Sequence, residues 1–194
     1  MTSCSIKTFF YWVVSLSKVW YTLNVLIIPN FFMKPTCLFL GRFQPFHIGH
    51  LMVIQGMTKV CSRIVIGIGS ADKQGTEENP FSAEHRKEMI QRALQEENII
   101  PLFDVEFVDL PDHPEDEAWT KMVLEKVGEI DKVWTGNEAT KNCFEGKVEI
   151  QWIKEVPGFS GTQIRELMKK GGYWEEKVPD DVASYLKQNN LIKH

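Results

Sequence analysis

Short apolar runs alternate with longer amphipathic segments along most of the chain. The apolar runs predict strands at residues 36–40, 63–68, 104–108, 132–135 and 147–153. Between them, residues 48–60, 82–97 and 115–127 place apolar side chains at three- and four-residue steps, which predicts helices. This alternation indicates an α/β fold in which helices flank both faces of a five-stranded parallel sheet.

The segment after the last predicted strand, "GFSGTQIRELMKKGG", begins with small hydroxyl residues and ends in two glycines. Such residues are typical of helix N-caps and C-caps, so a short helix is predicted here. A second helix is predicted at residues 180–188, where Val182, Tyr185 and Leu186 form an apolar face. The two helices make a small C-terminal helical tail.

The first 32 residues differ in character from the rest. Residues 9–28 are aromatic and β-branched and carry no acid, but Lys18 lies near their middle. A central lysine costs a membrane span about 2.5–3.5 kcal/mol, so a membrane role is not favoured, and no small-residue cleavage site supports a signal peptide. Because Met33 resembles a natural start, we interpret residues 1–32 as an extension outside the fold and residues 33–194 as a single domain. The alternative is an anchor or docking segment.

The charge balance argues against nucleic acid as a partner. The chain holds 22 Lys and Arg against 26 Asp and Glu, for a net charge of −4. Residues 1–32 contribute two lysines and no acid, so the predicted domain carries a net charge of −6. Nucleic-acid binding generally needs a basic surface, whereas a small anionic ligand needs a few local cations and a helix N-terminus.

Four cysteines are spread along the chain with neither a C-x-x-C pair nor a zinc-binding spacing. This usage indicates a reduced, cytoplasmic protein. On the same ground we expect no structural disulfide.

The loop after the first predicted strand, "GRFQPFHIGH", holds the strongest candidate chemistry. Ligands of open parallel sheets bind at the carboxyl ends of the strands, which is where this loop lies. His47 and His50 then fall at the start of the following helix, where imidazoles can donate hydrogen bonds to phosphate oxygens. The alternative is that one of the two histidines is a core residue with satisfied hydrogen bonds.

Two ordered motifs carry a resemblance to a known family. "GRFQPFHIGH" resembles the first signature of the HxGH nucleotidyltransferase superfamily, and "FSGTQIRELM" resembles its second. Together with "IGSADKQGTEENPFSAEHR" and "VWTGN", the chain from about Met33 to Trp174 resembles archaeal-type nicotinamide-nucleotide adenylyltransferases. The resemblance implies a Rossmann-like nucleotidyltransferase fold and transfer of the adenylyl group of ATP to the 5'-phosphate of nicotinamide mononucleotide (NMN). The products would be NAD and pyrophosphate, formed by direct in-line displacement.

The resemblance also implies roles for individual residues. His47, His50, Arg42 and Arg165 would contact the triphosphate and the transferring phosphate, and Arg86 would face a phosphate as well. Further nucleotide-binding positions implied by the match are Gly41, Phe43, Gly49, Gly69, Ser70, Gly136, Asn137, Ser160, Gly161 and Thr162. Mg²⁺ would arrive with ATP, no dedicated protein site for it is predicted, and a cytoplasmic homo-oligomer is expected.

The residues themselves support Arg165, because Ile164, Leu167 and Met168 form the predicted buried stripe of its helix and leave the arginine beside the free N–H groups of the first turn. A solvated helix residue is the alternative. "GIGSAD" at residues 67–72 lacks the third glycine of G-x-G-x-x-G and is not a fingerprint of a hydride-transfer enzyme.

Trp119 matches the family position that stacks on the nicotinamide ring, and an indole face suits a cationic pyridinium. The alternative is a core tryptophan on an amphipathic helix. The preceding segment, residues 109–117, departs from the usual family pattern in being strongly acidic.

Three other functions are alternatives to this one. "HIGH" also occurs in class I aminoacyl-tRNA synthetases, but the chain lacks a KMSKS-like sequence and length for tRNA recognition. A nearer alternative keeps nucleotidyl transfer with another acceptor, such as phosphopantetheine, flavin mononucleotide or an alcohol phosphate, with CTP as a conceivable donor. The third is a nucleotide-binding regulator without turnover.

Overall fold

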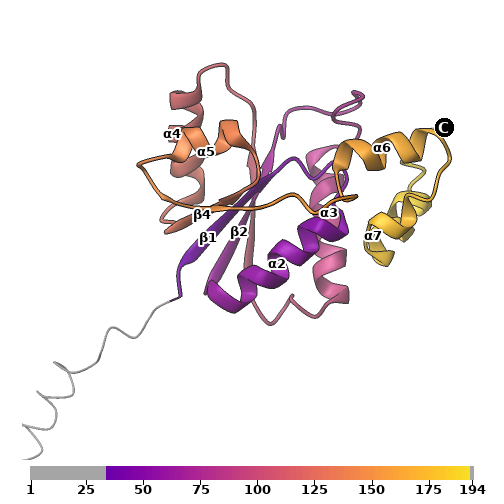
Figure 1. The fold of residues 1–194 in the computed structure, drawn as a ribbon, viewed down its shortest axis with the longest axis horizontal. Coiled ribbons are helices and arrows are strands. Elements are labelled where there is room, and N and C mark those ends of the chain that lie inside the picture. Colours follow the sequence, from indigo (N-terminus) through magenta and orange to yellow (C-terminus); the bar gives the residue numbers. More distant parts are fainter. Residues whose placement is uncertain (1–33, 193–194) are drawn as a thin grey trace, which may run out of the picture. The chain divides into compact units, whose positions relative to one another are not determined.

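The computed structural model describes residues 34–192, so the predicted role of residues 1–32 lies outside the described residues. Within this range the chain forms the predicted parallel sheet (Figure 1), with strand order β3-β2-β1-β4-β5. The strands are β1 (Thr36–Gly41), β2 (Arg63–Gly69), β3 (Asp104–Leu110), β4 (Lys132–Thr135) and β5 (Glu149–Trp152). All five predicted strands are confirmed, and β5 is shorter than the pattern indicated.

The predicted helices are also present. They are α2 (Ile48–Val60), α3 (Ala83–Glu96), α4 (Asp116–Val127), α6 (Gly161–Lys169) and α7 (Asp180–Gln188). The sequence pattern did not predict the short helix α5 (Glu138–Phe144) or the 3₁₀ turn η1 (Glu175–Lys177). Helix α6 ends as expected, because Gly171 has a φ of 64° and the N–H of Gly172 bonds back to Leu167 O.

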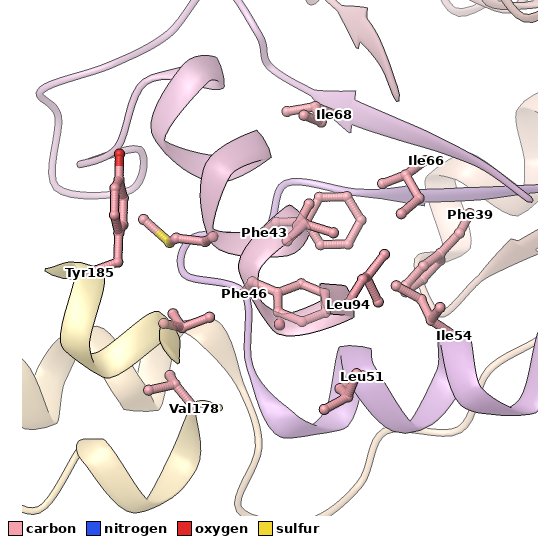
Figure 2. Packing of buried hydrophobic residues seen from close by; sticks show 14 of the residues in the cluster. Phe39, Phe43, Phe46, Leu51, Ile54, Ile66, Ile68, Leu94, Val178 and Tyr185 are labelled. Atoms are coloured by element: carbon pink, nitrogen blue, oxygen red, sulfur yellow. The ribbon is translucent and has the colours of Figure 1, made fainter. Parts of the chain in front are cut away.

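The sheet separates two hydrophobic clusters. Successive strand residues point to opposite faces, so Cys37 and Phe39 join one cluster while Leu38 and Leu40 join the other. The larger cluster lies under α2, α3, α6 and α7, and Figure 2 shows Phe43, Phe46 and Ile54 packed within it. The smaller cluster lies under α4 and α5, on the opposite face in Figure 1. Both faces are therefore covered, as predicted.

The strand order places a topological switch point between β1 and β4. The chain runs outward from β1 through β2 to β3 and then returns to the other side of β1, where Phe39 pairs with Trp134. The loops after β1 and β4 consequently diverge at the carboxyl ends of two neighbouring strands. This divergence is the usual origin of a ligand crevice in an open parallel sheet.

The prediction of no disulfide is wrong for this structure, in which Cys37 and Cys61 form one, with their Cα atoms 6.0 Å apart. The sequence separation of 24 residues concealed the pairing. In a β-α-β unit the helix returns the chain to the amino end of the sheet, so Cys61, the C-cap of α2, comes to lie beside the start of β1. Cys143 is free and buried.

None of the helices within residues 34–192 is both long and apolar enough to span a bilayer.

Candidate active site

A cavity of about 390 Å³ opens at the carboxyl ends of β1 and β4, and we call it the β1–β4 cavity. It brings together most of the site residues expected from the sequence, although they come from three separate parts of the chain. The expected residues that line it are Arg42, Phe43, His47, Gly49, His50, Gly136, Asn137, Ser160, Gly161, Thr162 and Arg165. Gly41 lies immediately before Arg42, at the end of β1.

His47 and His50 form a capping box at the N-terminus of α2, in which the side chain of each accepts a hydrogen bond from the main chain of the other. The main-chain N–H of His50 donates to His47 Nδ1, and the N–H of His47 donates to His50 Nδ1, both at 3.3 Å. The rings stack with centroids 3.5 Å apart. Because each Nδ1 accepts a hydrogen bond, the ring proton of a neutral imidazole resides on Nε2. Both histidines line the β1–β4 cavity.

Glycine is required between the two histidines. A Cβ on Gly49 would lie 3.1 Å from two atoms of the His47 ring and 3.2 Å from Phe159 Cβ. The small residue therefore permits both the ring stacking and the close approach of the segment before α6.

Both imidazoles are neutral at pH 7. Burial lowers the pKa of His47 from 6.5 to about 4. Burial, and secondarily the nearby charge of His47, lowers the pKa of His50 well below its usual value. Two neutral rings can stack closely without charge repulsion.

The depressed pKa makes the folded state sensitive to acid. Unfolded His47 binds a proton at a pKa of 6.5 and folded His47 at about 4, so its contribution to stability is present above 6.5 and is lost as the pH falls. Between about pH 7 and pH 5.5 we expect the wild type to lose about 1 kcal/mol more unfolding free energy than His47→Asn. Urea unfolding of both proteins at the two pH values measures the difference, and equal losses would contradict the neutral, buried ring.

The two cavity arginines approach from different elements. Arg165, in the second turn of α6, donates from Nη1 to Gln44 O at 2.9 Å and from Nη2 to Thr162 Oγ1 at 3.2 Å. Arg42, in the loop after β1, is half exposed, with Nη1 3.8 Å from Glu78 Oε2. Burial first, and then the charge of Arg42, lowers the pKa of Arg165. Two neighbouring cations therefore face one cavity, where a polyphosphate would relieve their mutual repulsion.

Helix α6 also contributes main-chain donors. Its N-cap, Ser160, makes no capping hydrogen bond with its side chain, so the first-turn N–H groups remain beside the cavity. Ile164 and Met168 are buried and Leu167 is partly buried, which confirms the predicted stripe and leaves Arg165 off it. A helix N-terminus of this kind favours an anion.

Gln44 is a structural residue of the site that sequence reasoning missed. Its side chain pairs with the main chain of Phe81 in both directions, from Nε2 to Phe81 O at 2.9 Å and from Phe81 N to Oε1 at 3.0 Å. Its own carbonyl accepts from Arg165. The preceding residue, Phe43, is buried and has a φ of 51°, which costs energy in a non-glycine residue. These contacts hold the loop in that conformation.

Arg86, which the resemblance implied would face a phosphate, is not among the residues that line the β1–β4 cavity. Its side chain is fully buried and donates to main-chain carbonyls of Ser82, Arg42, Gly69 and Ser70. Gly69 and Ser70, which were expected to contact nucleotide, also lie outside the residues that line the β1–β4 cavity. The motif "PFSAEHR" indicated a functional arginine, but the pattern alone could not show whether the guanidinium points to solvent or into the protein.

Trp119 lines a separate cavity of about 480 Å³, which we call the Trp119 cavity. Its ring packs edge-on against Phe144, and Nε1 donates to Pro111 O at 3.2 Å, so the side chain is fixed by the core and also borders open space. The other lining residues are Lys73, Asp112, His113, Pro114, Asp116, Ala139, Thr140 and Cys143. The two cavities adjoin the start of α5. Asn137 lines the β1–β4 cavity, and Thr140, whose N–H donates to Asn137 Oδ1, lines the Trp119 cavity.

A parallel α/β sheet with donors and cations gathered at its switch point is the architecture of a nucleotide-binding protein. A family model described as cytidylyltransferase-like matches residues 38–167. The nicotinamide-nucleotide adenylyltransferase of Pyrococcus furiosus is 36% identical over 154 residues, which cover 78% of this chain and 82% of the relative. That of Thermoplasma volcanium is 35% identical over 152 residues, which cover 77% and 84%. The chain therefore belongs to the cytidylyltransferase-like family of nucleotidyltransferases and, within it, to the nicotinamide-nucleotide adenylyltransferases.

Solved structures support the same fold. A bifunctional NMN adenylyltransferase/ADP ribose pyrophosphatase from Francisella tularensis matches with a TM-score of 0.70 at 23% identity, covering 80% of this chain. The chain spans 50% of that longer protein. A Plasmodium falciparum nicotinic acid mononucleotide adenylyltransferase matches with a TM-score of 0.57 at 15% identity, covering 81% of this chain and 96% of that one.

Proposed function

We propose that this protein transfers the adenylyl group of ATP to the 5'-phosphate of NMN, forming NAD and pyrophosphate. The observation that carries the proposal is the convergence of His47, His50 and Arg165 on one cavity at the switch point of the sheet. The alignments with the archaeal relatives cover more than three quarters of this chain, and the names of these relatives support the choice of substrates.

In this proposal ATP occupies the β1–β4 cavity. The Nε2–H groups of His47 and His50 donate to phosphate oxygens, Arg42 and Arg165 offset the charge of the triphosphate, and the N-termini of α2 and α6 add main-chain donors. The donors are fixed before the reaction by capping and stacking, so little reorganisation is needed as charge moves between phosphates.

NMN would occupy the Trp119 cavity with its cationic ring against the indole face. A 5'-phosphate oxygen then attacks the α-phosphorus of ATP from the side opposite the pyrophosphate. The new P–O bond forms as the bond to the bridging oxygen breaks, and pyrophosphate leaves with that electron pair. No proton has to be removed from the attacking phosphate, so positioning and charge stabilisation suffice.

Mg²⁺ is proposed to accompany ATP and to offset the negative charge of the phosphates. Within residues 34–192, no group of three or more His, Cys, Asp or Glu side chains could hold a metal ion. Mg²⁺ on nucleotides is usually held chiefly by phosphate oxygens and water.

A product assay tests the proposal. The purified protein with ATP, Mg²⁺ and NMN should form NAD, detected by a coupled dehydrogenase. Parallel assays replace NMN with phosphopantetheine, flavin mononucleotide or an alcohol phosphate, and ATP with CTP. A higher kcat/KM for another acceptor would overturn the substrate assignment, and nucleotide binding without any product would favour a regulator.

Trp119→Ala is expected to raise the KM for NMN about 10-fold, because it removes an aromatic–cation contact of about 0.5–2 kcal/mol. The KM for ATP and kcat should change little. Steady-state kinetics with each substrate varied in turn measure the split. Trp152→Ala is the matched control, since Trp152 is 41% exposed on β5 and borders neither cavity. An unchanged KM for NMN in Trp119→Ala would show that the tryptophan is a core residue alone.

Three broader features belong to the same proposal. A single working domain over residues 33–194 stays a prediction. The acidic net charge is the reason for expecting no nucleic-acid partner. A cytoplasmic location and a homo-oligomer stay predictions, and size-exclusion chromatography tests the second.

A further inference from the structure

Arg86 combines complete burial with an unusual set of partners. Its side chain has 0% exposure. Nε donates to Ser82 O at 3.2 Å, Nη1 to Arg42 O at 2.9 Å and Gly69 O at 2.7 Å, and Nη2 to Ser70 O at 3.1 Å. These bonds use four of the five N–H groups of the guanidinium, and within residues 34–192 every one goes to a main-chain carbonyl. Only one N–H group is left without a partner among the described residues, so the guanidinium has little capacity to bind a substrate phosphate.

The carbonyls belong to three different segments. Arg42 lies in the loop after β1, Gly69 is the last residue of β2 and Ser70 follows it. Ser82 is the N-cap of the helix that carries Arg86 itself. One side chain on α3 therefore ties together the carboxyl ends of the central strand β1 and its neighbour β2. The planar guanidinium is suited to this because its donors point in fixed directions, whereas a lysine ammonium is a compact, freely rotating charge.

The two segments that Arg86 connects, after β1 and after β2, contribute to the walls of different cavities. The Arg42 carbonyl lies on the segment whose side chains, Arg42 and Phe43, line the β1–β4 cavity. Ser70 is connected to the wall of the Trp119 cavity through Asp112. Ser70 Oγ donates to Asp112 Oδ1 at 2.9 Å, and the other Asp112 oxygen pairs with Lys73. Asp112 and Lys73 both line the Trp119 cavity. Arg86 thus lies at the junction between the walls of the two cavities.

We propose that Arg86 is a positioning residue that sets the separation and relative orientation of the two cavities without touching either substrate. The inference rests on the proposed function, in which one cavity holds ATP and the other NMN. In-line displacement requires the acceptor oxygen to lie close to the α-phosphorus and aligned with the departing bond, and displacements of about 1 Å can cost about 10²-fold in rate. Each cavity retains its own contacts when Arg86 is changed, so each substrate alone still binds.

The test compares Arg86→Lys and Arg86→Ala with the wild type, using kcat, both KM values, and calorimetric Kd values for ATP alone and NMN alone. We expect kcat to fall about 10²-fold while each KM and Kd stays within about threefold. Guanidinium ion at low millimolar concentration should partly restore kcat in Arg86→Ala, and methylammonium should not. Met89→Ala, a fully buried position on the same helix, is the control for lost packing and should retain kcat at temperatures where it is folded.

The outcomes separate the two proposals. A wild type that forms no NAD would overturn the proposed function. An active wild type whose Arg86→Lys variant keeps a normal kcat would overturn the positioning role, as would a kcat loss matched in Met89→Ala at equal stability. A large loss of ATP affinity without a kcat effect would instead make Arg86 a phosphate contact. If Arg86→Ala fails to fold, Arg86→Lys still distinguishes these results.

Discussion

Replacing His47 with asparagine is expected to lower kcat by about 10²- to 10³-fold while leaving the protein folded. Asparagine is a strong N-cap residue, and its side-chain oxygen can accept the N–H of His50 as Nδ1 of His47 does. It lacks the Nε2–H donor that the neutral imidazole offers to the transferring phosphate. Because that contact strengthens as charge develops, the loss should appear in kcat far more than in the KM for ATP. Steady-state kinetics measure kcat and the KM for ATP, and thermal unfolding measures stability.

His47→Ala provides the comparison, since it removes the donor and the cap together. The kcat of His47→Ala should match that of His47→Asn. Its free energy of unfolding should be about 1 kcal/mol lower than that of His47→Asn, because the cap is lost. The same pair of changes at His50 should give the same separation, as its Nδ1 accepts from His47 N. Wild-type kcat in His47→Asn would mean that the histidines serve α2 as caps and nothing more.

The helices that could be predicted were those with an apolar face and recognisable ends. Helices α2 and α7 occur at the predicted bounds, because each combines a clear apolar face with unambiguous ends. Helix α5 escaped prediction since its seven residues hold too few apolar positions to show a period. Its start, Asn137, nevertheless carries a recognisable capping signal, with Oδ1 accepting from the N–H of Thr140.

Within the candidate site, residues close together in the sequence could be predicted, and contacts between distant segments could not. Residues adjacent in sequence within a motif, such as His47, Gly49 and His50, line one cavity, because a strand exit and a helix start fix their relative positions locally. Arg86 and the Cys37–Cys61 disulfide depend on segments that meet through the tertiary fold. A pattern in one sequence contains no information on which way a side chain turns after its helix docks. The directions that sequence reasoning missed are therefore those determined by packing between elements.

Arg165→Ala is expected to lower kcat/KM for ATP by about 10³-fold or more, because it removes a cation that faces the transferring phosphates and a tie between two parts of the site. The guanidinium holds α6 to the loop after β1 through Gln44 O and also bonds Thr162. Both its charge and its fork geometry should matter. Arg165→Lys keeps the charge but loses the fork, so its kcat/KM should fall between those of the wild type and the alanine variant. Initial rates across a range of ATP concentrations give the comparison.

Lys170→Ala is the matched control, since Lys170 is an exposed cation at the C-terminal end of the same helix and lines neither cavity. It changes the net charge by the same amount and should leave kcat/KM near the wild-type value. If both variants lost activity equally, a general electrostatic effect would explain the result. If Arg165→Ala remained fully active, the arginine would be a solvated helix residue that ties α6 to its neighbour, and polyphosphate binding would have to depend on Arg42 and the two imidazoles.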